Sequence, residues 1–174
     1  MKIFLIGFMA SGKTTIGSAL AHTLALPFID LDYAIETHYQ RTITELFTLY
    51  GEATFRQIEQ QTLHNIISHN DDFVLATGGG TPCFYDNMDV MNQSGATIFM
   101  SLNKEILIQR LSHIENVRPL LHGLAEMELR TEIERLLKKR SIFYLKSRFI
   151  ISITNQTVNE IVLDIIKEIN LPRG

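Results

Sequence analysis

The segment Gly7-Phe8-Met9-Ala10-Ser11-Gly12-Lys13-Thr14 matches the pattern G-x-x-x-x-G-K-[S/T] at every defined position. The run from Lys2 to Ile6 before it is rich in β-branched and aromatic residues, which favours a strand. After it, Ile16, Leu20 and Leu24 recur at helical spacing. The glycines let backbone N–H groups point inward at a helix N-terminus, where an anion is stabilised. The stretch therefore predicts a phosphate-binding loop between a strand and a helix.

The side chains of this loop have separate expected roles. We expect Lys13 to bridge the β- and γ-phosphates of ATP, and the Thr14 hydroxyl to ligate Mg²⁺. The predicted nucleotide-binding residues of the loop are Ala10, Ser11, Gly12, Lys13, Thr14 and Thr15. The alternative, a glycine turn carrying a surface lysine, leaves the flanking strand and helix unexplained.

Strands and helices alternate along the rest of the chain. Further strands are expected at Phe28–Leu31, Phe73–Ala76, Ala96–Leu102 and Phe149–Ile153, and helices at about 43–67, 104–112, 126–144 and 158–169. This alternation predicts one α/β domain over residues 1–174, with a parallel sheet covered by helices on both faces and ligands at the carboxyl ends of its strands. The helical segment 33–69 exceeds what a crossover needs, so we expect a substrate-binding insertion there. Residues 113–124 are polar, and their apolar residues follow neither the helical nor the strand periodicity, so we expect a mobile loop.

Composition excludes several classes of protein. A chain with 45% hydrophobic and 20% charged residues is neither disordered nor collagen-like. Its longest apolar stretch, Ile3 to Ala10, is too short to span a membrane, and no leader pattern is evident, so we expect a cytoplasmic protein with no membrane partner. Cys83 is the single cysteine and no Cys or His cluster has zinc spacing, so neither an internal disulfide nor a zinc site is expected.

Charge is distributed unevenly. Residues 1–100 carry 4 basic and 10 acidic side chains, whereas residues 101–174 carry 12 basic and 9 acidic ones. The second part is therefore expected to face an anion. The seven basic residues from Arg130 to Arg148 have no interleaved glycine, and the net charge is −3. These features favour a small phosphorylated ligand over a nucleic acid partner.

The kind of nucleotide-binding protein can be narrowed further. Asn103-Lys104-Glu105-Ile106 has isoleucine where a guanine-binding Asn-Lys-x-Asp motif needs aspartate, so a GTPase is not indicated. A large ATPase would need an apolar strand that ends in an acidic residue of the metal site. Here the strand that ends at Thr77 is followed by Gly78-Gly79-Gly80. Acidic support for the metal is therefore expected from Asp30 and Asp32.

Asp30 and Asp32 lie two residues apart at the end of the second strand. On an extended backbone their side chains leave on the same side, where they can serve metal-bound water or substrate hydroxyls. One alternative is that the two carboxylates only keep the end of the strand solvated. The other is that they form an N-cap for the helix that starts near Tyr33.

Two arginines interrupt apolar helical faces. Arg140 lies within about 40° of both Leu136 and Tyr144 on the helical wheel, and a buried guanidinium needs a partner such as an anionic ligand. Arg56 lies three residues before Glu59, which shares a stripe with neighbouring apolar residues. Such a positioned arginine could bind a carboxylate in bidentate fashion. The alternatives are an Arg140 that reaches solvent or pairs with a protein carboxylate, and a structural Arg56–Glu59 ion pair.

In order and spacing, these motifs resemble the shikimate kinases over most of the chain, from Lys2 to about Ile169. The resemblance rests on Gly7 to Thr15, Phe28-Ile29-Asp30-Leu31-Asp32 with Ile35-Glu36, Gly51-Glu52 with Phe55-Arg56 and Glu59, Gly78-Gly79-Gly80, Arg118-Pro119-Leu120-Leu121, and Arg140 with Tyr144. It implies a P-loop kinase similar to the nucleoside monophosphate kinases. The implied reaction transfers the γ-phosphoryl group of ATP to the 3-hydroxyl of shikimate, on the route to chorismate and aromatic amino acids.

The resemblance also implies roles for single residues. Asp32 would hold the shikimate hydroxyls and orient the reacting proton, Arg56 and Arg140 would clamp the carboxylate, and the Gly79 backbone would contact the ring. Arg118 would meet the ATP phosphates from a lid at 113–124. Asp30 would support Mg²⁺ through water, alongside Thr14. Arg110 and Asn155-Gln156 would be candidates for adenine neighbours, and we expect a monomer.

Three positions depart from the family pattern. Ala10 replaces a common glycine, Thr81-Pro82-Cys83 is unusual after the triple glycine, and Ser147 replaces a usual alanine. Two other functions remain open. One is a related small-molecule kinase such as a gluconate kinase, which has no reason to carry both Arg56 and Arg140. The other is a nucleotide-binding protein without catalysis.

Overall fold

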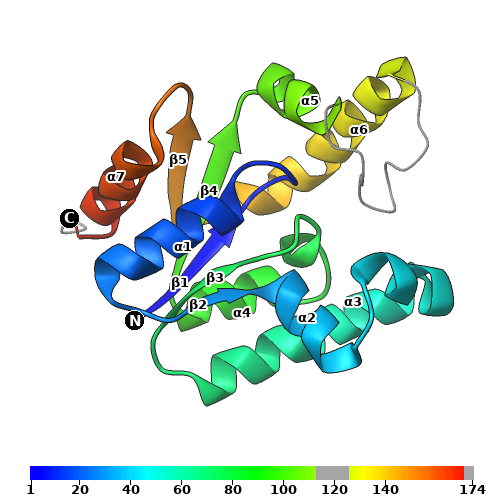
Figure 1. Cartoon of the computed structure of the whole chain (residues 1–174), viewed down its shortest axis with the longest axis horizontal. Helices are drawn as coiled ribbons and strands as arrows, with labels where there is room; N and C mark the ends of the chain where they lie inside the picture. The colour runs from blue at the N-terminus through cyan, green and yellow to red at the C-terminus, as the bar shows by residue number, and fades with distance from the viewer. Residues whose placement is uncertain (113–125, 171–174) are drawn as a thin grey trace.

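The computed structural model describes residues 1–112 and 126–170, which form a five-stranded parallel sheet flanked by helices (Figure 1). The strands lie in the order β2-β3-β1-β4-β5, with every neighbouring pair parallel. Their bounds are β1 Lys2–Ile6, β2 Phe28–Asp30, β3 Phe73–Ala76, β4 Ala96–Leu102 and β5 Phe149–Ile153. The predicted parallel sheet is confirmed.

Helices cover both faces of the sheet because alternate strand residues point to opposite sides. On β1, Ile3 and Leu5 face a core built with α1 and α7, whereas Phe4 and Ile6 face a larger core that includes α2 to α6. The helices are α1 Lys13–Leu24, α2 Leu31–Tyr39, α3 Ile43–His69, α4 Asn87–Ser94, α5 Lys104–Ser112, α6 Glu126–Tyr144 and α7 Val158–Asn170. Among the helices that the structure describes, none is both long and apolar enough to pass through a bilayer.

The connection between β2 and β3 differs from the expected single helical stretch. It contains two helices, α2 and α3, and the first begins at Leu31, two residues earlier than predicted. Strand β2 correspondingly ends at Asp30 rather than Leu31. Within α3, Gly51 has φ 76° and ψ 168°, a conformation that glycine adopts readily, and the helix is kinked there.

Two short elements after β3 were not predicted. A 3₁₀ turn covers Thr81–Cys83, and α4 follows after three residues. Both are too short for a clear helical period, and α4 buries only one side, through Met88 and Met91. Together they return the chain from the triple-glycine segment to β4.

Candidate functional site

The phosphate-binding loop lies between β1 and α1, as predicted, and folds back over its own lysine. The Lys13 ammonium donates hydrogen bonds to the carbonyl oxygens of Gly7 at 2.9 Å and Phe8 at 2.7 Å. Gly12 caps α1 with φ 93°, a left-handed conformation that favours glycine. Ala10 also adopts positive φ, 61°, so the alanine that departs from the family pattern takes a conformation suited to glycine.

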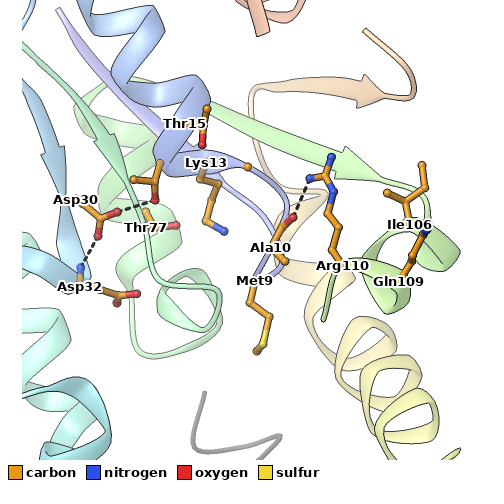
Figure 2. A pocket seen from close by; sticks show the side chains of 12 residues that line it. Met9, Ala10, Lys13, Thr15, Asp30, Asp32, Thr77, Ile106, Gln109 and Arg110 are labelled. Atoms are coloured by element: carbon orange, nitrogen blue, oxygen red, sulfur yellow. Dashed lines mark hydrogen bonds between the residues drawn. The ribbon is translucent and has the colours of Figure 1, made fainter. Parts of the chain in front are cut away.

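Beside the loop is a cavity of about 810 Å³ (Figure 2). Five of the six predicted nucleotide-binding loop residues line it: Ala10, Gly12, Lys13, Thr14 and Thr15. The sixth, Ser11, is only 1% exposed and does not line the cavity. The remaining walls come from Met9 of the same loop, Asp30 and Asp32, Thr77 after β3, and Ile106, Gln109 and Arg110 of α5. Because a helix N-terminus and a lysine border this space, it suits the phosphates of a nucleotide.

Asp30 has two roles in the structure, one through each carboxylate oxygen. Its Oδ1 accepts hydrogen bonds from the backbone N–H groups of Asp32 at 3.0 Å and Tyr33 at 3.3 Å, which makes Asp30 the N-cap of α2. Its Oδ2 accepts a 2.7 Å hydrogen bond from the Thr14 hydroxyl (Figure 2). The N-cap interpretation is thus correct, whereas the direct hydrogen bond between Thr14 and Asp30 was not predicted.

The expectation that Asp30 and Asp32 both lie on extended backbone is wrong. The cap turns the chain into α2 directly after Asp30, so Asp32 lies in the first helical turn and not on extended backbone. Both residues nevertheless line the same cavity.

The oxygen groups of Thr14 and Asp30 fit Mg²⁺, which binds hard oxygen ligands and retains several waters. Within the described residues, no group of three or more His, Cys, Asp or Glu side chains is arranged to hold a metal ion. A magnesium site built from one or two protein oxygens and nucleotide phosphates needs no such group.

The triple glycine brings together residues that are far apart in the sequence. A Cβ atom on Gly78 would lie 2.7 Å from Glu59 Oε1 and 3.0 Å from Asp32 Oδ1. On Gly79 it would lie 3.4 Å from Arg140 Nη1, and on Gly80 only 2.6 Å from Arg56 Nη2. Asp32, Arg56, Gly79 and Arg140, the predicted acceptor-binding residues, therefore meet around this segment. A side chain at 78 or 80 would displace the charged end of Glu59 or Arg56, so glycine at these positions leaves room for both groups.

Arg56 is held in place by a buried ion pair. Its Nη1 lies 2.7 Å from Glu59 Oε2, and the two residues are only 5% and 1% exposed. Thr81 donates a 2.6 Å hydrogen bond to the other Glu59 oxygen, and the ring of Phe84 lies 4.4 Å from the guanidinium carbon. Burial raises the pKa of Glu59, although Arg56 and the Thr81 hydrogen bond act in the opposite direction. The expected orientation of Arg56 by Glu59 is confirmed, whereas Thr81 and Phe84 had no sequence signal of their own.

Arg140 is equally buried but lacks such a partner. It is 5% exposed, and its guanidinium carbon lies 5.5 Å from the centre of the Phe8 ring. Among the described residues, no acceptor hydrogen-bonds its buried Nη1 and no carboxylate forms an ion pair with it. The alternative in which Glu59 pairs with Arg140 is therefore not observed in this part of the chain. A buried cation is costly to leave uncompensated, so this position favours an anionic ligand.

The remaining predicted residues lie at or beyond the edge of this site. Arg110 lines the cavity and donates a 3.0 Å hydrogen bond to the Ala10 carbonyl (Figure 2). Gln156 instead accepts from Thr154 N at 2.7 Å in its own turn, away from the lining of the cavity. Arg118 and the predicted lid lie outside the described residues. Burial raises the pKa of Cys83 to about 11, so its thiol is protonated at neutral pH.

The fold and the loop define a P-loop kinase. A family model described as shikimate kinase matches residues 9–170, and the chain belongs to the shikimate kinase family. A shikimate kinase from Bacteroides thetaiotaomicron is 45% identical over 150 residues, covering 86% of this chain and 85% of the relative.

Solved structures agree with this assignment. A 1.7 Å crystal structure of shikimate kinase from Bacteroides thetaiotaomicron has a TM-score of 0.90 at 39% identity, covering 98% of this chain and 99% of the other. Shikimate kinase from Acinetobacter baumannii in complex with shikimate has a TM-score of 0.89 at 31% identity, covering 97% and 92%. A gluconokinase from Sinorhizobium meliloti, at 17% identity and a TM-score of 0.56, shares the fold alone.

Proposed function

We propose that this chain transfers the γ-phosphoryl group of ATP to the 3-hydroxyl of shikimate, a step toward chorismate and the aromatic amino acids. The observation that supports this most directly is the position of two buried arginines, Arg56 and Arg140, beside consecutive glycines next to the phosphate-binding cavity. A small acceptor with one carboxylate matches that pair, because guanidinium groups bind carboxylates with strong, directional hydrogen bonds.

On the donor side, the loop and its lysine stabilise the phosphates. The Lys13 ammonium exchanges its hydrogen bonds to the Gly7 and Phe8 carbonyls for contacts with the β- and γ-phosphates. Thr14 would hold Mg²⁺ directly and Asp30 would hold it through water. When bound, this ion neutralises charge on the phosphate oxygens.

On the acceptor side, Asp32 occupies the junction between donor and acceptor. It lines the phosphate cavity and also borders Gly78, so it can hold the acceptor hydroxyls while the reacting one faces the phosphates. Arg56 and Arg140 hold the carboxylate at the other end of the molecule, and the Gly79 backbone contacts the ring. Catalysis then consists mainly of alignment and charge stabilisation, as phosphoryl transfer requires.

Further parts of the proposal rest on the family pattern and the nature of the substrates. Arg118, on a lid at 113–124, supplies positive charge to the phosphates in the transition state. The enzyme acts as a monomer in the cytoplasm, where ATP is available.

The reaction itself is tested by measuring ADP release from ATP with shikimate, with gluconate and with neither. We expect release only with shikimate, because gluconate lacks the ring that Gly79 and Asp32 are proposed to contact. Equal release with gluconate would favour the related small-molecule kinase. Nucleotide binding without any release would favour a protein that binds nucleotide without catalysis.

The role of Asp32 can be separated from that of the nucleotide site. We expect Asp32→Asn to lower kcat by about 10²-fold or more, the cost of losing a positioned acid–base group, while ATP affinity stays near that of the wild type. Steady-state kinetics and ATP titration check this, with the exposed Asp89→Asn as a control that should change neither value. Normal transfer by Asp32→Asn would contradict the assignment.

The carboxylate clamp gives a second expectation. Arg140→Met should raise the KM for shikimate by an amount that corresponds to about 1.5–3 kcal/mol, with little change in ATP affinity, because a charge-assisted pair is lost. The neighbouring Lys139→Met is a matched control, since Lys139 is exposed on the same helix.

A shikimate analogue without the carboxylate completes this test. The analogue should be phosphorylated about equally well by the wild type and by Arg140→Met. If the variant loses as much activity on the analogue as on shikimate, Arg140 has a structural role and does not bind the carboxylate.

A further inference from the structure

Helix α6 contributes a second side chain to the acceptor region, one turn beyond Arg140. Tyr144 is completely buried, and its ring packs against Phe99 with 5.2 Å between ring centres. Its hydroxyl donates a 2.5 Å hydrogen bond to the carbonyl oxygen of Gly79. Tyr144 thus joins the end of α6 directly to the middle of the triple glycine.

This hydrogen bond determines the orientation of one peptide group. The described chain has no cis peptide bonds, and in a trans peptide the C=O of one residue and the N–H of the next point in opposite directions. Anchoring the Gly79 carbonyl to Tyr144 therefore turns the Gly80 N–H away from α6. Glycine backbone has wide conformational freedom and no side chain to restrict it, so an external anchor has a large effect here.

The orientation matters because the two arginines flank this same peptide. Arg140 Nη1 lies 3.4 Å from the position of a Gly79 Cβ, and Arg56 Nη2 lies 2.6 Å from that of a Gly80 Cβ. Rotation of this peptide about the line between its two Cα atoms would turn the Gly79 carbonyl and the Gly80 N–H to new directions beside both arginines. The spacing between the guanidinium groups and the backbone that faces the acceptor therefore depends on the Gly79–Gly80 plane.

We infer that Tyr144 is a positioning residue for the acceptor: its hydroxyl fixes the Gly79–Gly80 peptide between Arg140 and Arg56. This inference rests on the proposed function, since it assigns Tyr144 to the shikimate side of that site. Tyr144 acts through the glycine backbone, whereas the hydrogen bonds of the phosphate-binding loop involve other residues. Its effect should accordingly be confined to one substrate.

The test is Tyr144→Phe, which keeps the buried ring against Phe99 and removes only the hydroxyl. We expect the KM for shikimate to rise about tenfold, the effect of losing one buried hydrogen bond, and the KM for ATP to stay within about twofold of the wild type. Ile133→Val is a matched control, because Ile133 is fully buried on the same helix and the substitution removes one methylene. It should lower the melting temperature and leave both KM values unchanged.

Three results would overturn the inference. One is a Tyr144→Phe variant with a lower melting temperature and unchanged shikimate kinetics, which would assign the hydroxyl to stability alone. Another is an equal rise in both KM values, as a general loosening would cause. The third is Ile133→Val changing the KM for shikimate as Tyr144→Phe does. Failure of the wild-type chain to phosphorylate shikimate would overturn the proposed function as well, and the same assay distinguishes that outcome.

Discussion

Charged side chains can converge on the acceptor region because the backbone at Gly78–Gly80 has no side chains of its own. Added Cβ atoms would crowd Glu59 and Asp32 at position 78 and Arg56 at position 80, and Arg140 Nη1 lies 3.4 Å from the position of a Cβ at 79. The segment follows β3 in the middle of the sheet, beside β1 and its phosphate-binding loop. Donor and acceptor regions are therefore neighbours as a consequence of strand order.

Of the two arginines buried around this segment, only Arg56 forms an ion pair with a carboxylate of the described residues. Arg56 is offset by Glu59, and that carboxylate is also satisfied by Thr81. Arg140 has no comparable carboxylate in the same part of the chain. Leaving a cation uncompensated in a low-dielectric region opposes folding, and an anionic ligand removes part of that cost. Under the proposed function, the same charge that opposes folding would attract the carboxylate of the acceptor.

Sequence patterns predicted what depends on local periodicity. The loop, the order of strands and helices, and the burial of Arg140 and Glu59 follow from spacing along one element, and the structure confirms them. The extended backbone through Asp32 was wrong because a side-chain cap at Asp30 started α2 earlier. The bond from Tyr144 to Gly79 spans 65 residues, so no local pattern could predict it. Tyr144 fitted an apolar stripe, and only the fold shows where its hydroxyl points.

The different partners of the two Asp30 oxygens have a consequence for the start of α2. Oδ1 holds the start of α2, and Oδ2 faces Thr14. Because the carboxylate is one rigid planar group, a rotation that changes the partner of Oδ2 also moves Oδ1 relative to the N–H groups of Asp32 and Tyr33. The first turn of α2, which carries Asp32, is therefore linked through one side chain to Thr14 of the phosphate-binding loop.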